Sequence, residues 1–230
     1  MDRRTYLRSL AAGTGVGAAV GTAGCLGVLG DSGAEGAVLG PPEQDLSEAV
    51  HPSYGDEMPE FTVPDPITGE EVSTGQFEGD RAFLWTSFYT NCPKGVCPAL
   101  ILRLRRAQEY AAEQGYGDRA AFLPLTFDPQ RDTAEALREY AGQQGVDLDA
   151  GNWHFLRPES YEAGKELMMD NFGLKIEKTD PDQYETEYTF PHYGLILLVN
   201  EQGIVERAYP GGTNTDIEAL VDDFDRVITA

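Results

Sequence analysis

The chain of 230 residues carries 17 Lys and Arg against 39 Asp and Glu, a formal net charge of −22, and 41% of its residues are hydrophobic. This apolar share is enough for one folded core and argues against wholesale disorder, while three cysteines are too few for a disulfide-built scaffold. The negative charge disfavours binding to nucleic acid or anionic lipid headgroups, because both repel an acidic surface.

Residues 1–24 are predicted to be an export signal rather than part of the fold. Arg3 and Arg4 open a short basic region, and a weakly apolar stretch rich in Gly and Ala follows. This order is similar to a twin-arginine (Tat) signal, and residues 22–25 are similar to a lipobox, so cleavage would leave a lipidated Cys25. An uncleaved anchor is the alternative, although the stretch is shorter than the ~20 apolar residues of a comfortable span. Both place the chain on the outer face of the cytoplasmic membrane.

The acidity belongs to the exported part of the chain. Without residues 1–24 it carries 14 basic against 38 acidic residues, a net charge of −24. Such a surface is typical of a halophile, where dense carboxylates keep a protein solvated and salt screens their repulsion. An ordinary acidic exported protein is the alternative.

Residues 25–58 are predicted to be a flexible tether that begins at the lipidated cysteine. Residues 26–58 include six Gly and three Pro and show no helical or strand period. A coil of this length would span on the order of 30 Å. His51 and Met58 lie in this segment and are interpreted as incidental. Residues 59–230 are predicted to form the folded domain.

From residue 61 onward, apolar runs alternate with amphipathic stretches that end near Gly. The predicted strands are residues 61–63, 71–73, 81–89, 121–127, 153–156, 193–200 and 204–208. The predicted helices are residues 98–114, a segment from the cap at 132 or 133 toward 140, 159–171 and 216–228. The first two strands form a hairpin, and the rest alternate with helices. This order predicts an α/β fold with a mixed central sheet, helices on both faces and an N-terminal β-hairpin extension.

The reactive side chains concentrate where the first long strand ends. Cys92 and Cys97 flank a short loop that leads into a helix. The unpaired N–H groups and the dipole of a helix N-terminus favour thiolate over thiol, so lowered thiol pKa values are expected. The alternative is two buried structural cysteines, which the Pro, Lys and Gly between them disfavour.

Two separated motifs resemble one known family. The first is Phe-Tyr-Thr-Asn-Cys-Pro at 88–93 followed by Cys97-Pro98, and the second is Asp-Pro-Gln-Arg-Asp-Thr at 128–133 with Leu137, Tyr140 and Ala141. Over roughly residues 60–228 the chain resembles the SCO/SenC family of thioredoxin-fold copper chaperones. The resemblance implies a thioredoxin-like fold, a membrane-tethered location and a part in building the copper site of cytochrome c oxidase. The partner that it implies is an oxidase subunit that receives the copper.

In that family two motif cysteines and a distant histidine bind copper, so the resemblance implies Cys92, Cys97 and His192 as ligands. His192 matches by register, because it lies eight positions before Asn200, which opens the turn that ends at Gly203. Thioredoxin-like reductases carry a proline six positions before that turn residue, where this chain has Gly194. A polar residue at a strand entry is the alternative interpretation of His192.

Two thiolates and one imidazole suit a soft metal and favour Cu(I). One added ligand would allow Cu(II), or Zn(II) as a competitor. Three ligands also leave the metal open to exchange with a partner, and oxidation of the dithiol would prevent loading. The chain departs from the family in having four residues rather than three between the cysteines, and in Lys94 and Pro191 where acidic residues are usual. These departures are expected to weaken copper binding or to shift the balance toward redox reactions of the dithiol.

Other functions use the same residues differently. An extracytoplasmic thiol:disulfide oxidoreductase would use Cys92 as the attacking thiolate and Cys97 as the resolving thiol, without His192. A peroxidase would use Cys92 but needs an activating Thr/Arg arrangement that the sequence does not display, and a metal-free binding module would leave the cysteine motif unexplained.

Some further residues carry chemistry in principle but are interpreted as structural. Asp128 and Arg131 are predicted to form a polar cluster near the site. Met168 and Met169 are neighbours on a helix and point to different faces, which favours core packing over metal binding. His154 is predicted to be a packed histidine.

Overall fold

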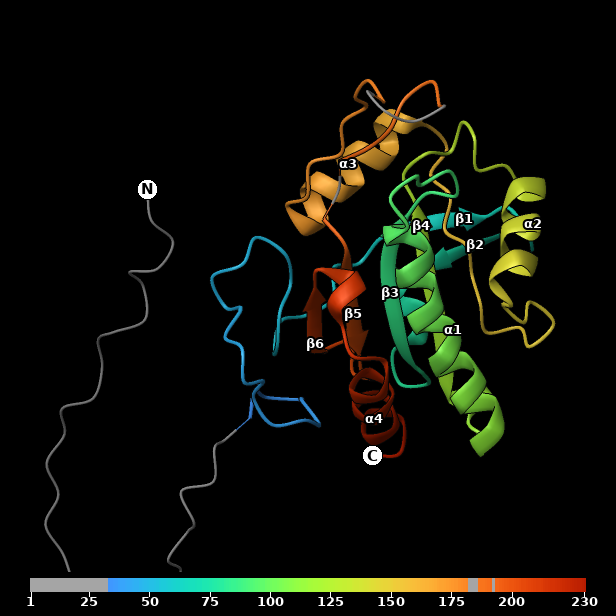
Figure 1. The fold of residues 1–230 in the computed structure, drawn as a ribbon. Coiled ribbons are helices and arrows are strands. Elements are labelled where there is room, and N and C mark those ends of the chain that lie inside the picture. The colour runs from blue at the N-terminus through green and yellow to red at the C-terminus, as the bar shows by residue number, and fades with distance from the viewer. Residues whose placement is uncertain (1–32, 182–185, 192) are drawn as a thin grey trace, which may run out of the picture. The chain divides into compact units, whose positions relative to one another are not determined.

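The computed structural model describes residues 33–181, 186–191 and 193–230 (Figure 1). The strands are β1 (Thr62–Asp65), β2 (Glu70–Ser73), β3 (Ala82–Phe88), β4 (Ala120–Thr126), β5 (Leu195–Val199) and β6 (Val205–Pro210). The helices are α1 (Val96–Gln114), α2 (Ala134–Gln144), α3 (Tyr161–Phe172) and α4 (Ile217–Ile228). Among these described helices, none has the length and apolar character that crossing a membrane requires.

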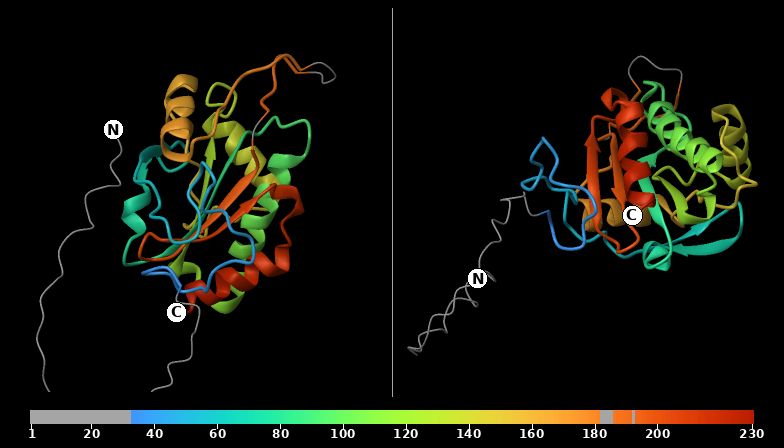
Figure 2. Two further views of the ribbon diagram at one scale, coloured as in Figure 1. Left: turned by 90° about the vertical axis from the view of Figure 1, so that its left-hand side faces the viewer. Right: turned by 90° about the horizontal axis from the view of Figure 1, so that it is seen from below.

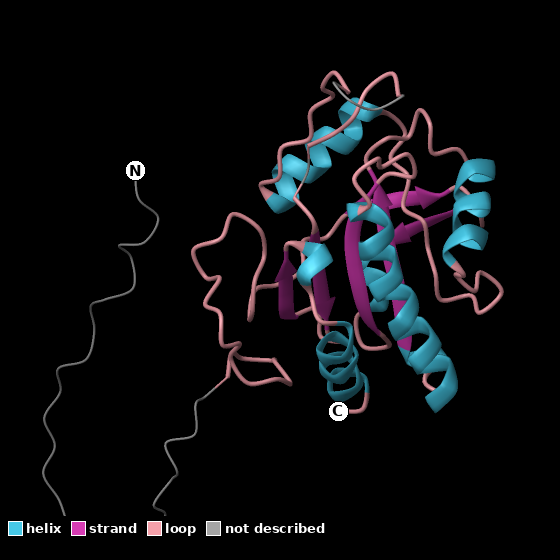
Figure 3. Ribbon diagram, in the orientation of Figure 1, coloured by secondary structure: helices cyan, strands magenta, loops and turns pink. Residues whose placement is uncertain are grey.

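The central sheet is mixed, with the strand order β4-β3-β5-β6. Strand β3 runs parallel to β4 and antiparallel to β5, while β1 and β2 form a separate antiparallel hairpin. Every residue of β3, β4 and β5 is buried, as expected for strands covered on both faces. The predicted mixed sheet and N-terminal hairpin are therefore confirmed (Figure 3).

Helices lie on both faces of the sheet, as predicted. Helices α1 and α4 lie side by side on one face, and α3 lies with the hairpin on the other (Figure 2). The indole of Trp85 on β3 stacks on the Phe172 ring of α3, with ring centroids 3.9 Å apart. Both side chains are fully buried, so burial of these aromatic surfaces fixes α3 on the sheet.

The helix boundaries follow local capping chemistry. The Thr133 side chain accepts a hydrogen bond from the Ala136 N–H at the start of α2, so Thr133 rather than Asp132 is the cap. Helix α2 ends at Gly145 and α3 at Gly173, both in the left-handed conformation that glycine adopts without strain.

The strand predicted at 153–156 is only partly formed. Two isolated parallel bridges join this segment to β4, at Trp153 and at Leu156. Between them lies Pro124, which has no N–H to donate, so the ladder is interrupted. The prediction of a continuous strand is therefore wrong, although the segment lies where it was expected.

The prediction of a flexible tether is also wrong for residues 33–58, which pack against the domain. We call this segment the strap. The buried Glu206 carboxylate on β6 accepts hydrogen bonds from the Val38 and Leu39 N–H groups at 2.6 and 2.9 Å. Gly55 N–H donates to the Val205 carbonyl, which adds backbone pairing at the edge of β6. A carboxylate buried inside the domain thus holds a segment that by composition resembles coil.

Candidate functional site

The two cysteines lie where β3 ends and α1 begins. Cys97 is the second residue of α1 and is fully buried, while Cys92 is half-buried in the preceding loop. The two side chains are hydrogen-bonded to each other. Gly95 caps the helix with a φ of 72°, and this left-handed turn returns the loop toward its start. The four-residue spacing therefore still brings the two sulfur atoms together as thiols.

The expected lowering of the thiol pKa is wrong for Cys97. Burial raises the pKa of the Cys97 thiol well above its ordinary value, and the hydrogen bond to Cys92 raises it further. The Tyr89 N–H donates to Cys97 Sγ at 3.5 Å, which opposes this shift only in part. Exclusion of water outweighs the helix dipole here, because burial penalises the thiolate more than one helix end stabilises it.

Tyr89 links the thiol pair to the segment that precedes β5. Its hydroxyl shares a 3.0 Å hydrogen bond with the Thr189 hydroxyl, and its ring lies 5.1 Å from the Phe190 ring, centroid to centroid. Burial raises the pKa of Tyr89 to about 12, so its hydroxyl stays protonated. The 186–191 segment is thereby held against the strand end that carries the cysteine loop.

His192, the predicted third ligand, lies outside the described residues. Described residues on either side of it lie against residues that flank the cysteine loop. Phe190 packs on Tyr89, and at Gly194 an added Cβ would come within 3.3 Å of Val96 Cγ1. Glycine therefore lets the chain approach the first residue of α1 closely at this point.

A buried carboxylate braces the cysteine loop. Asp132 is fully buried and accepts hydrogen bonds from the Thr90 N–H at 3.3 Å and the Thr90 hydroxyl at 2.6 Å. The Thr126 hydroxyl also donates to it. Burial raises the pKa of Asp132 to about 6, against the lowering effect of these hydrogen bonds. Sequence patterns suggested Asp132 only as a helix cap, because nothing local shows which way an aspartate next to a capping threonine will turn.

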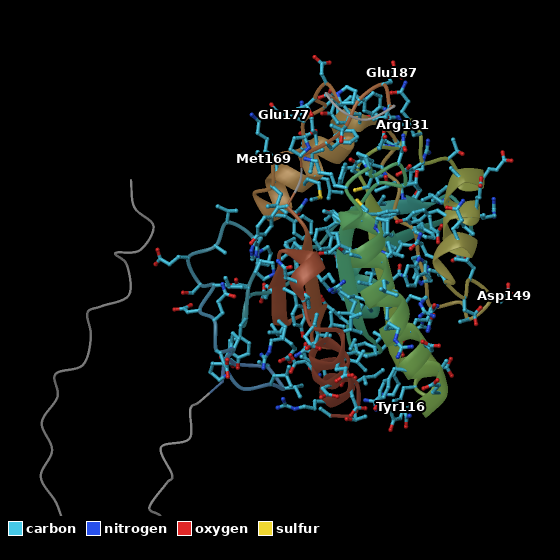
Figure 4. All side chains as sticks on the ribbon, in the orientation of Figure 1. Tyr116, Arg131, Asp149, Met169, Glu177 and Glu187 are labelled. Atoms are coloured by element: carbon cyan, nitrogen blue, oxygen red, sulfur yellow. The ribbon has the colours of Figure 1, made fainter. Side chains whose placement is uncertain are left out.

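Asp128 and Arg131 form the predicted structural cluster. The Arg131 guanidinium lies 3.3 Å from the centroid of the Tyr188 ring, and the Tyr188 hydroxyl donates to Asp128 Oδ1 at 2.9 Å. Arg131 and Glu187 lie at the same end of the molecule, opposite Tyr116 (Figure 4). The cluster fastens the 186–191 segment to the loop after β4.

The other chemistry-bearing residues lie elsewhere. His154 is a packed histidine as predicted, with Nδ1 3.7 Å from the buried Asp65 Oδ2. Met168 is fully buried, whereas Met169 is 45% exposed, so the two methionines do point to different faces. His51 is buried in the strap and stacks on the Tyr193 ring with centroids 5.7 Å apart, so it packs the strap against the domain. In the described ranges, no three or more His, Cys, Asp or Glu side chains gather as a metal site.

Fold and site together define a dithiol protein of thioredoxin-like architecture, with the thiol pair at the start of the first long helix. The chain belongs to the SCO1/SenC family, whose family model matches residues 52–229. The recognition of this family from its two motifs is thus confirmed.

Several relatives share this fold. A SCO1 protein homolog of Bacillus subtilis is 24% identical over 155 residues, covering 67% of this chain and 75% of the relative. The crystal structure of a SCO1/SenC family lipoprotein from Bacillus anthracis has a TM-score of 0.60 at 24% identity, over 74% of this chain and 94% of that one. The copper-bound ScoI of Arabidopsis thaliana has a TM-score of 0.59 at 20% identity, over 76% and 100% of the two chains.

Proposed function

We propose that this protein is a copper chaperone, anchored to the outer face of the cytoplasmic membrane, that assists assembly of the copper site of a respiratory oxidase. It binds copper through Cys92, Cys97 and His192 and passes it to the oxidase subunit that receives it. Family membership supports this, since solved Sco structures carry copper and one relative is described as a member of the Sco family of cytochrome c oxidase assembly proteins.

The observation that carries the proposal is the direct contact between the two thiols. Paired sulfur atoms at the start of a helix are a donor set that favours Cu(I) over hard cations, even though carboxylates abound on this surface. Copper binding would displace the thiol protons, because the metal takes thiolates. The raised pKa of Cys97 therefore makes loading of this site compete with protons.

The first experiment measures Cu(I) affinity by competition with a chromophoric chelator. His192→Ala and Cys97→Ser are each expected to weaken binding at least tenfold, because each removes one of three ligands. Met169→Ala, which removes an exposed soft donor outside the site, is the control and should bind as wild type does. Unchanged affinity in His192→Ala would defeat the ligand assignment.

A thiol:disulfide oxidoreductase is the second candidate, and the unequal exposure of the two cysteines favours it. The half-buried Cys92 can meet a substrate disulfide, while the buried Cys97 is placed to resolve the mixed disulfide. Reduction of insulin disulfides by His192→Ala and by a further variant, Cys92→Ser, separates the two functions. An oxidoreductase keeps this activity in His192→Ala and loses it in Cys92→Ser.

A further inference from the structure

Several buried side-chain polar atoms of the described residues lack a hydrogen-bond partner, and one of them is the hydroxyl of Tyr140. Tyr140 on α2 is 5% exposed, and its hydroxyl oxygen makes no hydrogen bond in the part of the chain that the structure describes. A buried hydroxyl without a partner costs about 1–3 kcal/mol, so native structures rarely keep one. The Tyr140 hydroxyl can therefore donate a hydrogen bond to an acceptor that the reduced, metal-free protein does not offer.

The position of Tyr140 is fixed by the end of β3. Its ring stacks on Phe88, with centroids 5.7 Å apart, and Phe88 directly precedes Tyr89, whose N–H donates to Cys97 Sγ. Negative charge on Cys97 or Cys92 raises the pKa of Tyr140 further, which places the hydroxyl within electrostatic range of both cysteines. Burial raises the pKa of Tyr140 above its ordinary value, so the hydroxyl keeps its proton and can donate. The unpartnered donor therefore lies beside the dithiol.

We propose that Tyr140 is a positioning residue whose hydroxyl donates a hydrogen bond to a cysteine sulfur when the pair carries negative charge, as in the thiolate or copper-bound state. A thiol is a weak acceptor, whereas a thiolate is a strong one. Hydrogen bonds to metal-bound sulfur also tune the metal site. The copper-bound part of this inference rests on the proposed function, while the thiolate part concerns the dithiol alone.

The test compares Tyr140→Phe with wild type in three measurements. Cu(I) affinity is expected to fall about tenfold, because one charge-assisted hydrogen bond is lost. The reduction potential of the Cys92–Cys97 disulfide, measured against glutathione at alkaline pH where a thiolate forms, should become more negative, because the thiolate loses a donor. The unfolding midpoint of the reduced, metal-free protein should stay the same or rise, because the variant removes a hydroxyl that has no partner there.

Tyr110→Phe is the matched control, since it removes a hydroxyl that bonds Asp225 from the distal half of α1. It should leave copper affinity and potential unchanged. The inference is overturned if Tyr140→Phe matches wild type in both copper affinity and potential, or if it destabilises the reduced, metal-free protein. If wild type fails to bind Cu(I), the chaperone function falls and the potential alone decides the role of Tyr140.

Discussion

At the scale of single residues, burial dominates the chemistry of the site. Cys97 lies where a helix dipole favours the thiolate, yet the absence of water raises its pKa. Asp132 accepts several hydrogen bonds and still has its pKa raised to about 6. Both groups therefore keep their protons to a higher pH than exposed counterparts do.

Asp132 should make the protein less stable as pH rises from about 4 to about 6. Its carboxyl binds a proton more tightly in the folded state than in the unfolded one, so ionisation favours unfolding. The rise of the Asp132 pKa from 3.8 to about 6 corresponds to about 3 kcal/mol of folding stability, which is lost as the pH rises through about 6. The difference in unfolding free energy between wild type and Asp132→Asn, measured by urea titration from pH 4 to 7, should change by that order. A constant difference would contradict the raised pKa of Asp132.

At the scale of elements, the strap and the segment before β5 are irregular yet firmly attached. The strap is held by the Glu206 carboxylate, and the 186–191 segment by Tyr89, Asp128 and Arg131. None of these hydrogen bonds depends on helix or strand periodicity. Each joins residues more than fifty positions apart, so local patterns along the chain cannot reveal them.

Glu206→Ala is expected to release the strap from β6. The substitution leaves the Val38 and Leu39 N–H groups without their acceptor, at a cost of about 2 kcal/mol or more. Hydrogen exchange should show faster exchange at these two amides, together with a lower unfolding midpoint. The exposed Glu35 lies in the same strap, and Glu35→Ala should change neither. Unchanged protection of Val38 and Leu39 in Glu206→Ala would show that other contacts hold the strap.

At the scale of the whole molecule, the negative charge of the protein opposes its attachment to an anionic membrane. The part of the chain after residue 24 carries a net charge of −24, and such a surface is repelled by an anionic leaflet. The proposed membrane attachment is therefore assigned to acyl chains rather than to the protein surface. We therefore propose lipidation of Cys25, following export by the Tat route.

The protein from a membrane fraction is expected to carry lipid on an N-terminal Cys25, as mass spectrometry of the mature terminus would show. A variant that begins at residue 26 should be soluble and should not bind vesicles of anionic lipid, because only the acidic surface remains. Wild type should stay with the membrane after washing in high salt. An intact Met1 terminus on the membrane-bound protein would reject the anchor.

The sequence alone determined the order of strands and helices, because burial on one or two faces imposes a period that survives in the residues themselves. The strands at 81–89 and 121–127 and the helix at 98–114 agree with β3, β4 and α1 within a few residues. The two motifs also identified the family, because the residues around the cysteine pair and in the loop after β4 are recognisable in the sequence itself.

Only the tertiary structure decided the raised pKa of Cys97, the inward turn of Asp132, the attachment of the strap and the unpartnered hydroxyl of Tyr140. Each of these depends on how much water and which donors surround one atom. That environment is built by segments distant in sequence, so no local pattern encodes it.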